Sequence, residues 1–200
     1  MEKKVYRMEV DENDQDSGVF ALSLVEFPAI EENFVYLSKQ KEIKLATIDE
    51  EKRIVVGPAL VPNKQIPRID ENTGEEYFIL FPEDTVRLAA QLYLKRQMNN
   101  NTTLEHSEGV EDISVVESWI VNDPLRDKSN SYGMEPEVGT WMVVMKIQND
   151  SVWTDYVKTG KVKGLSLEGN FSFKEMELSE EDKNLQEIKK LLSEYFTDSI

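Results

Sequence analysis

The chain contains one histidine, His106, and a serine, Ser166, that lies between two glycines in the segment Gly164-Leu-Ser-Leu-Glu-Gly169. A serine hydroxyl attacks a carbonyl poorly until a neighbouring base removes its proton, and an imidazole can serve as that base. Glycines beside the serine let a substrate backbone approach and leave amide protons free to bind an oxyanion. The pair therefore predicts a hydrolytic nucleophile with its general base.

Two glutamates are candidates for orienting the imidazole. In the strand-like segment 113–121, strict alternation places Glu117 on one face with four apolar residues, Ile113, Val115, Trp119 and Val121. A carboxylate in such surroundings needs a partner, and a histidine from an adjacent strand would be held by it in the correct tautomer. Glu168, two residues after Ser166 and on its face, is the competing candidate. Glu117 can instead meet a lysine or arginine or point to solvent, so both glutamates stay open.

Each of these residues also has a simpler structural explanation. Serine is common on the polar face of a half-exposed strand, and a lone histidine at a strand end is most often a surface residue. A serine and lysine dyad using Lys161 or Lys163 is conceivable, although both lysines suit solvated strand charges.

Composition excludes several classes of function. The net charge of −16 makes nucleic acids and anionic membranes poor partners, because both bind clustered Lys and Arg. The absence of cysteine excludes disulfides, thiolate zinc sites and a cysteine nucleophile. One histidine argues against a histidine metal cluster, and segment 11–16 lacks the glycine and closing glutamate of an EF-hand loop. We expect no metal and no cofactor. We also expect no export signal and no membrane span, hence a protein made and used in a cytosol.

Hydrophobic periodicity predicts one domain that is mostly β. The predicted strands cover residues 5–10, 19–25, 54–62, 77–81, 113–121, 140–147 and 161–173. We expect 54–62 and 77–81 to be a hairpin or neighbouring antiparallel strands, with a turn at Asn72-Thr-Gly74. Helices are predicted from Pro82, ending at the Asn99–Asn101 run, and from Asn149 to Gly160, and the loop 122–138 is a natural place for substrate contacts.

Seven segments together resemble the XkdF-like phage serine proteases. They are Ser23-Leu-Val-Glu-Phe-Pro-Ala-Ile30, Gly57-Pro-Ala-Leu-Val-Pro-Asn63, Tyr77-Phe-Ile-Leu-Phe-Pro82, Glu105-His106, Val116-Glu-Ser-Trp-Ile-Val121, Gly139-Thr-Trp-Met-Val143 and Gly164-Leu-Ser-Leu-Glu-Gly169. The family is grouped with the prohead maturation proteases of tailed phages and, more remotely, with the herpesvirus assemblin fold. The resemblance implies an α+β, mostly β architecture, an antiparallel β-barrel of about six to eight strands flanked by a few helices.

The resemblance also implies roles and partners. Ser166 would be the nucleophile and His106 the general base of an endopeptidase that works through an acyl-enzyme. Such relatives act inside assembling proheads in the bacterial host cytoplasm, where they cut scaffold or major capsid protein and often themselves. Their third catalytic member varies and can follow the serine in sequence, which keeps Glu168 beside Glu117 as a candidate.

The C-terminal part, residues 175–200, is acidic and separate in pattern from the protease-like domain, residues 1–174. Ser179-Glu-Glu-Asp182 resembles a capping box and opens an amphipathic helix. Its apolar stripe can pack on the domain, or dock on scaffold, capsid protein or a second copy of the chain in a homodimer.

Two other functions remain open. A non-catalytic structural or adaptor protein of the phage particle would retain the fold but not the activity. Hydrogen-bonding reach between the Ser166 Oγ and the His106 ring favours the enzyme, and a wide separation favours the adaptor. A carboxylate-based glycosidase has acids in surplus, but no feature selects two of them.

Overall fold

The computed structural model describes residues 3–28, 46–49, 52–70 and 72–176, and these ranges are mostly β. They contain twelve strands, the α-helices α1 (Glu83–Lys95) and α2 (Asp150–Val152), and the short helical turns η2 (Met98–Asn100), η3 (Lys128–Tyr132) and η4 (Trp153–Val157). No helix in these ranges is long and apolar enough to cross a membrane. The mostly β character with few helices is the one expected from the sequence.

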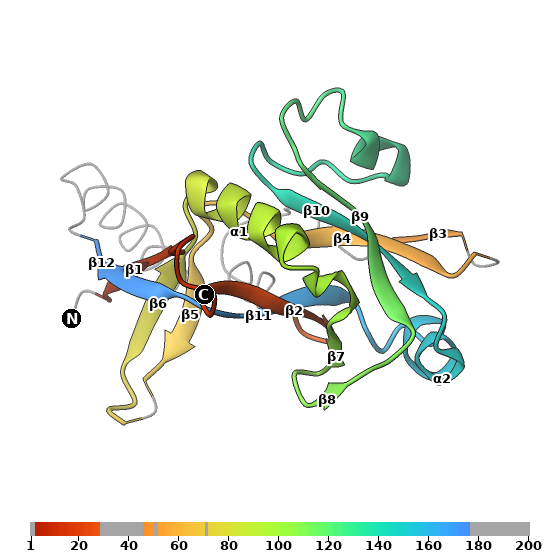
Figure 1. Ribbon diagram of the computed structural model, residues 1–200, viewed down its shortest axis with the longest axis horizontal. Coiled ribbons are helices and arrows are strands. Elements are labelled where there is room, and N and C mark those ends of the chain that lie inside the picture. The colour runs from red at the N-terminus through yellow and green to blue at the C-terminus, as the bar shows by residue number, and fades with distance from the viewer. Residues whose placement is uncertain (1–2, 29–45, 50–51, 71, 177–200) are drawn as a thin grey trace, which may run out of the picture.

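The strands form three four-stranded sheets (Figure 1). The first sheet has the order β12 (Ser172–Glu175), β1 (Val5–Glu9), β6 (Glu76–Leu80) and β5 (Ile66–Ile69). The second has the order β3 (Ala46–Asp49), β4 (Ile54–Leu60), β10 (Trp141–Ile147) and β9 (Ile113–Ile120). The third has the order β11 (Gly164–Asn170), β2 (Gly18–Val25), β7 (Thr102–Leu104) and β8 (Glu108–Gly109). None of these sheets closes on itself within the described residues, so the predicted β-barrel is not confirmed.

The predicted pairing of segments 54–62 and 77–81 is wrong. β4 belongs to the second sheet and β6 to the first, and β5, which the sequence analysis missed, pairs with β6 instead. β5 contains Pro67, whose missing amide proton argues against a strand in sequence. The proline is tolerated because β5 lies at the edge of its sheet.

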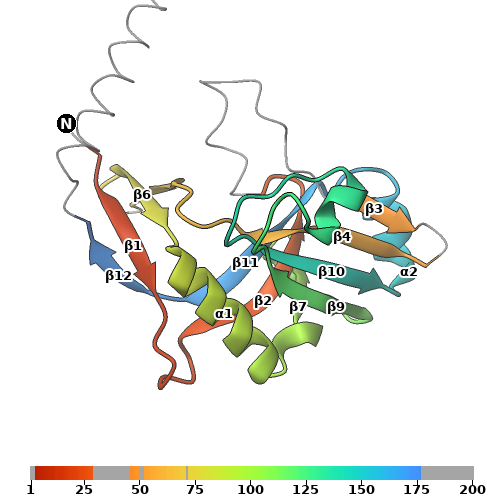
Figure 2. The same ribbon diagram turned by 90° about the horizontal axis from the view of Figure 1, so that it is seen from above.

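Helix α1 begins where the sequence predicts. Pro82 is its N-cap and two acidic residues, Glu83 and Asp84, lie in the first turn, where the helix dipole favours negative charge. The helix ends at Lys95, a few residues earlier than expected, because Gln97 adopts a left-handed conformation with φ of 60°. Figures 1 and 2 show α1 lying across the molecule, and it contacts β2, β9 and β10.

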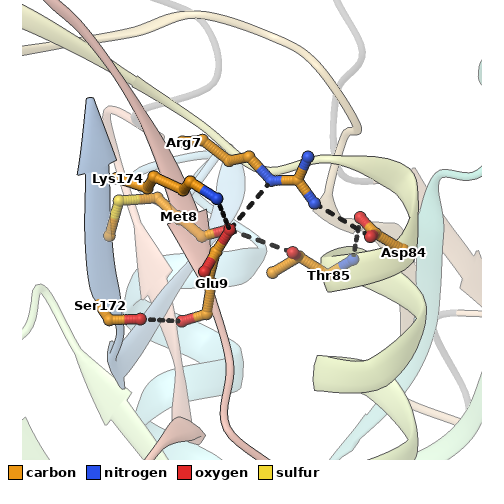
Figure 3. A network of polar contacts seen from close by, with 7 residues as sticks. All are labelled: Arg7, Met8, Glu9, Asp84, Thr85, Ser172 and Lys174. Atoms are coloured by element: carbon orange, nitrogen blue, oxygen red, sulfur yellow. Dashed lines mark hydrogen bonds and ion pairs between the residues drawn. The ribbon is translucent and has the colours of Figure 1, made fainter. Parts of the chain in front are cut away.

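A polar network ties the start of α1 to the first sheet (Figure 3). Thr85 donates a hydrogen bond to the carbonyl of Met8 at 3.1 Å, and Arg7 donates to Asp84 at 3.0 Å. Ser172 on β12 donates to the carbonyl of Glu9 at 3.3 Å. Because β12 follows β11 almost directly, the network also fixes the far end of the strand that carries Ser166.

The main hydrophobic core lies between the sheets and α1. Its largest fully buried side chains include Trp141 and Tyr93, whose ring centroids are 5.4 Å apart in an edge-on contact. A smaller cluster on the other face of the second sheet consists of Val56, Val121, Met134, Met142 and Val144. The predicted C-terminal helix, from Ser179 onward, lies outside the described residues, and β12 extends to Glu175, one residue into the segment assigned to it.

Candidate active site

Ser166 lies in β11, which pairs antiparallel with β2 in the third sheet. Its direct partner across the strand pair is Ser23. The flanking residues Leu165 and Leu167 pack with the main core, as the alternation in sequence predicts. Ser166, half-buried, therefore lies on the opposite, polar face of this sheet.

His106 lies on the tight turn between β7 and β8. The turn spans Leu104 to Ser107 and closes with a hydrogen bond from the Ser107 amide to the Leu104 carbonyl at 3.1 Å. Glu105 and His106 both have positive φ, 51° and 55°. Turns of this kind usually carry Asn-Gly. Holding a residue of another type in the left-handed conformation costs roughly 1–3 kcal/mol of conformational free energy.

Three hydrogen bonds to β2 and the residue after it hold this turn in place. The amide of Glu105 donates to the Leu24 carbonyl at 3.0 Å, and the amide of His106 donates to the Ser23 Oγ at 3.0 Å. The carboxylate of Glu105 accepts from the Glu26 amide at 2.7 Å. The strained turn is thus attached to the strand that lies beside β11.

The structure brings His106 and Glu168 together. The Nδ1 of His106 lies 3.2 Å from the Oε1 of Glu168, and the hydroxyl of Thr103 donates to the same carboxylate oxygen. The Glu168 side chain is only 21% exposed and that of His106 44% exposed. If Nδ1 carries the proton and donates it to Glu168, then Nε2 has a free lone pair that can accept a proton.

Ser166 shares a face with Glu168 and lies two residues before it. Side chains at this spacing are roughly 7 Å apart along a strand, which is a suitable gap for an imidazole between them. The described residues contain no hydrogen bond between the Ser166 hydroxyl and the His106 ring. Such contacts are often long in unliganded sites and shorten when substrate binds.

Glu117 lies elsewhere, and the face that strict alternation predicts for it is wrong. A β-bulge at Val116 interrupts β9, because Val115 pairs with Met145 while Glu117 pairs with the next residue, Val144. Beyond the bulge the faces are exchanged, so Glu117 leaves the face of Ile113 and Val115. Its side chain is 54% exposed, and its carboxylate forms an ion pair with Lys128.

The lysines considered for a serine and lysine dyad have other partners. The Lys163 ammonium lies 3.4 Å from the Glu26 carboxylate and 5.2 Å from the centre of the Phe27 ring. The Lys161 ammonium lies 5.1 Å from the centre of the Tyr156 ring. Both are exposed charges in the segment just before β11, which agrees with the simpler explanation that they are solvated.

The glycines around Ser166 have structural reasons of their own. A Cβ at Gly164 would lie 2.5 Å from the Pro28 ring, and a Cβ at Gly169 would lie 2.6 Å from the Gly18 carbonyl oxygen. Close packing therefore accounts for both glycines without a substrate.

The sequence analysis missed two residues that build the site, Ser23 and Thr103. Ser23 is fully buried between Leu22 and Leu24, and its Oγ accepts the His106 amide. A lone hydroxyl within a buried apolar strand needs a hydrogen-bond partner, and this was the available signal. Thr103 lies in β7, whose three residues are too few to show a periodic pattern. In the described part of the chain, no cluster of three or more His, Asp or Glu side chains could hold a metal ion.

Comparison with known proteins adds one match. The model of a family described as putative phage serine protease XkdF matches residues 42–175, which is more than half of the chain and includes His106, Ser166 and Glu168. Searches of the curated proteins and of the solved structures found no match. By the extent of the family match, this chain belongs to the phage serine protease family XkdF.

Proposed function

We propose that the protein is a serine endopeptidase in which Ser166 is the nucleophile, His106 the general base and Glu168 the residue that orients the base. The observation that carries the proposal is the 3.2 Å contact between His106 Nδ1 and Glu168, on the face of the sheet that Ser166 shares. The family description, a phage serine protease, supports the same chemistry.

The reaction follows from the roles of these three side chains. The Nε2 of His106 takes the proton of Ser166 as the Oγ bonds to the carbonyl carbon of the peptide. The imidazolium, stabilised by Glu168, then gives this proton to the leaving amine as the C–N bond breaks. The acyl-enzyme ester that results is hydrolysed by water, with His106 again accepting the proton.

The strained conformation of the turn that carries His106 supports a functional role for this residue. Two consecutive residues other than glycine are held with positive φ, and hydrogen bonds to β2 maintain them there. Backbone strain of this kind concentrates at active sites, where it fixes a side chain in a required position.

The proposed substrates are scaffold and major capsid protein, with self-cleavage as a further reaction, inside proheads in the host cytoplasm. This finer proposal is supported by the phage origin of the family and by its resemblance to prohead maturation proteases, which also motivates an assemblin-like barrel. The alternative is a non-catalytic adaptor of the phage particle. It is favoured by the lack of a hydrogen bond between Ser166 and His106 among the described residues.

The decisive experiment compares wild type with Ser166→Ala. The full chain is incubated with candidate phage scaffold and capsid proteins, and new termini are read by mass spectrometry. Labelling by a fluorophosphonate, which reacts with activated serines, is measured in parallel. We expect Ser166→Ala not to label and to cleave at least about 1,000-fold more slowly than wild type. Its circular dichroism spectrum should be unchanged.

Ser114→Ala is the matched control, because Ser114 is also a strand serine but lies on β9 in the second sheet. It should label and cleave as wild type does. Cleavage by Ser166→Ala at the wild-type rate would refute the assignment, and a wild type that neither labels nor cleaves would favour the adaptor.

A further inference from the structure

A cavity of about 190 Å³ lies where the three sheets meet, and Ser166 belongs to its lining. Its walls come from the first sheet (Met8, Ile66 and Ile79), the second (Ala59 and Leu60) and the third (Leu167). Arg68, the one charged residue in the lining, is exposed. Apart from Arg68 and Ser166, the lining consists of apolar side chains and a glycine.

The strand that carries Ser166 forms an edge beside this pocket. Among the described strands, β11 pairs only with β2, and it lies at the end of its sheet. The residues of β4, β5 and β6 that line the pocket belong to the other two sheets, and β4 also contacts β11. An edge strand offers backbone amides and carbonyls to which an extended peptide can pair as an additional strand.

An extended peptide on this edge would present its side chains alternately to the two faces of the sheet. One face carries Ser166 and Glu168, and the other carries Leu167, and the pocket at the edge of β11 is lined by both Ser166 and Leu167. A peptide whose carbonyl lies at Ser166 therefore directs a neighbouring side chain toward the pocket.

We infer that this pocket is the specificity subsite of the protease and holds an aliphatic or aromatic side chain next to the scissile bond. The inference rests on the proposed function. A dry cavity of about 150 Å³ lined by Leu, Ile and Phe binds benzene, so a pocket of this size and lining has room for an isobutyl or benzyl group. The pocket provides no buried charge that would pair with a charged side chain.

The test measures the preference for a single side chain. Wild type is given peptides that differ only at the residue beside the cleaved bond, with Phe, Leu, Ala or Gly at that position. We expect kcat/KM to be at least about tenfold higher for Phe or Leu than for Gly, because burying such a side chain in an apolar pocket adds binding free energy in the transition state. Ala59→Leu fills the pocket and should reduce the ratio of the Phe to the Gly value at least about fivefold.

A second variant and a control keep the test decisive if Ala59→Leu does not fold. Ile66→Ala widens the pocket and should raise the value for Phe relative to Leu. Val55→Ala is the control, because Val55 is a fully buried residue of β4 that does not line the pocket, and its Phe to Gly ratio should equal that of wild type. Wild-type cleavage with no preference, or a preference unchanged in both pocket variants, would overturn the inference and leave the proposed function intact. Failure of wild type to label with the fluorophosphonate would overturn the proposed function, and the subsite with it.

Discussion

Strands β9 and β11 each carry one of the two glutamates that the sequence offers as partner of His106, and each strand pairs in a ladder that contains a β-bulge. In the ladder of β11 the extra residue is Phe20 on the partner strand β2, so β11 itself is regular and Ser166 and Glu168 stay on one face. In β9 the shift falls before Glu117, so Glu117 leaves the face it shares in sequence with Val115. An extra residue on the strand itself thus changes the face of a glutamate, and an extra residue on the partner strand does not.

The comparison shows how far an alternating pattern can be followed. Side chains one residue apart point to opposite faces only while the ladder is regular, and a bulge exchanges the faces of every later residue. Within segment 113–121 the exchange also turns Trp119 to the smaller cluster and Ser118 toward Trp141, whose Nε1 donates to its Oγ at 2.9 Å.

The largest expected effect comes from neutralising the two glutamates in turn. Glu168→Gln should lower kcat for peptide cleavage by about 100- to 10,000-fold, because an amide does not stabilise the imidazolium and can hold the wrong tautomer. Glu117→Gln should leave kcat within about threefold of wild type, because its carboxylate pairs with Lys128 at an exposed site. Steady-state kinetics on one peptide, with thermal unfolding as the check on folding, measure both. Equal losses in the two variants would contradict the assignment of Glu168.

A smaller effect is expected from Gly169→Ala, which crowds the point where β11 pairs with the bulge of β2. The added Cβ would lie 2.6 Å from the Gly18 carbonyl oxygen and 2.7 Å from the Phe171 ring, so the backbone must move. We expect a loss of about 1–3 kcal/mol in the free energy of unfolding, measured by urea denaturation. Gly109→Ala is the control, because nothing lies within 4 Å of a Cβ there. A loss no larger than that of the control would show that the bulge adapts freely.

The smallest effect concerns Asp127, next to the lysine that pairs with Glu117. Burial raises the pKa of Asp127, but hydrogen bonds from Ser129 and Trp119 outweigh it, and the net pKa is lowered. A carboxyl with a lowered folded-state pKa contributes stability above its unfolded pKa of about 4, and this contribution is lost as pH falls through the folded-state value. Asp127→Asn should cost about 0.5–1 kcal/mol at pH 7, because the amide can still cap the helical turn but loses the charge that strengthens the hydrogen bonds from Ser129 and Trp119. Chemical denaturation should show that the difference in free energy of unfolding between wild type and Asp127→Asn is smaller near pH 2 than at pH 7. An equal difference at both pH values would contradict the link between the pKa of Asp127 and stability.

Much of the fold can be predicted from sequence. The rest depends on strands too short to show a periodic pattern and on pairing between residues far apart in the chain. Long apolar strands such as β2, β4 and β10, and the helix after Pro82, follow from periodicity and end signals. β5 and β7 escape detection because four and three residues carry no measurable alternation. The bulges are invisible because a regular and a bulged ladder can be written with the same residues.

The candidate site shows the same division. The residue types and the glycine-flanked strand single out His106 and Ser166, and the shared face of Ser166 and Glu168 follows from their spacing. The contact between His106 and Glu168 could not be derived, because it depends on β7 lying beside β2 and on an unusual turn.

The left-handed turn at Glu105 and His106 has a consequence for the evolution and engineering of this protein. Asn at the first position and Gly at the second would relax the backbone, so selection for thermal resistance alone favours discarding the imidazole. Directed evolution that selects only for thermal stability should replace His106 and give a more stable protein without activity. If His106 is retained under that selection, activity itself is being selected.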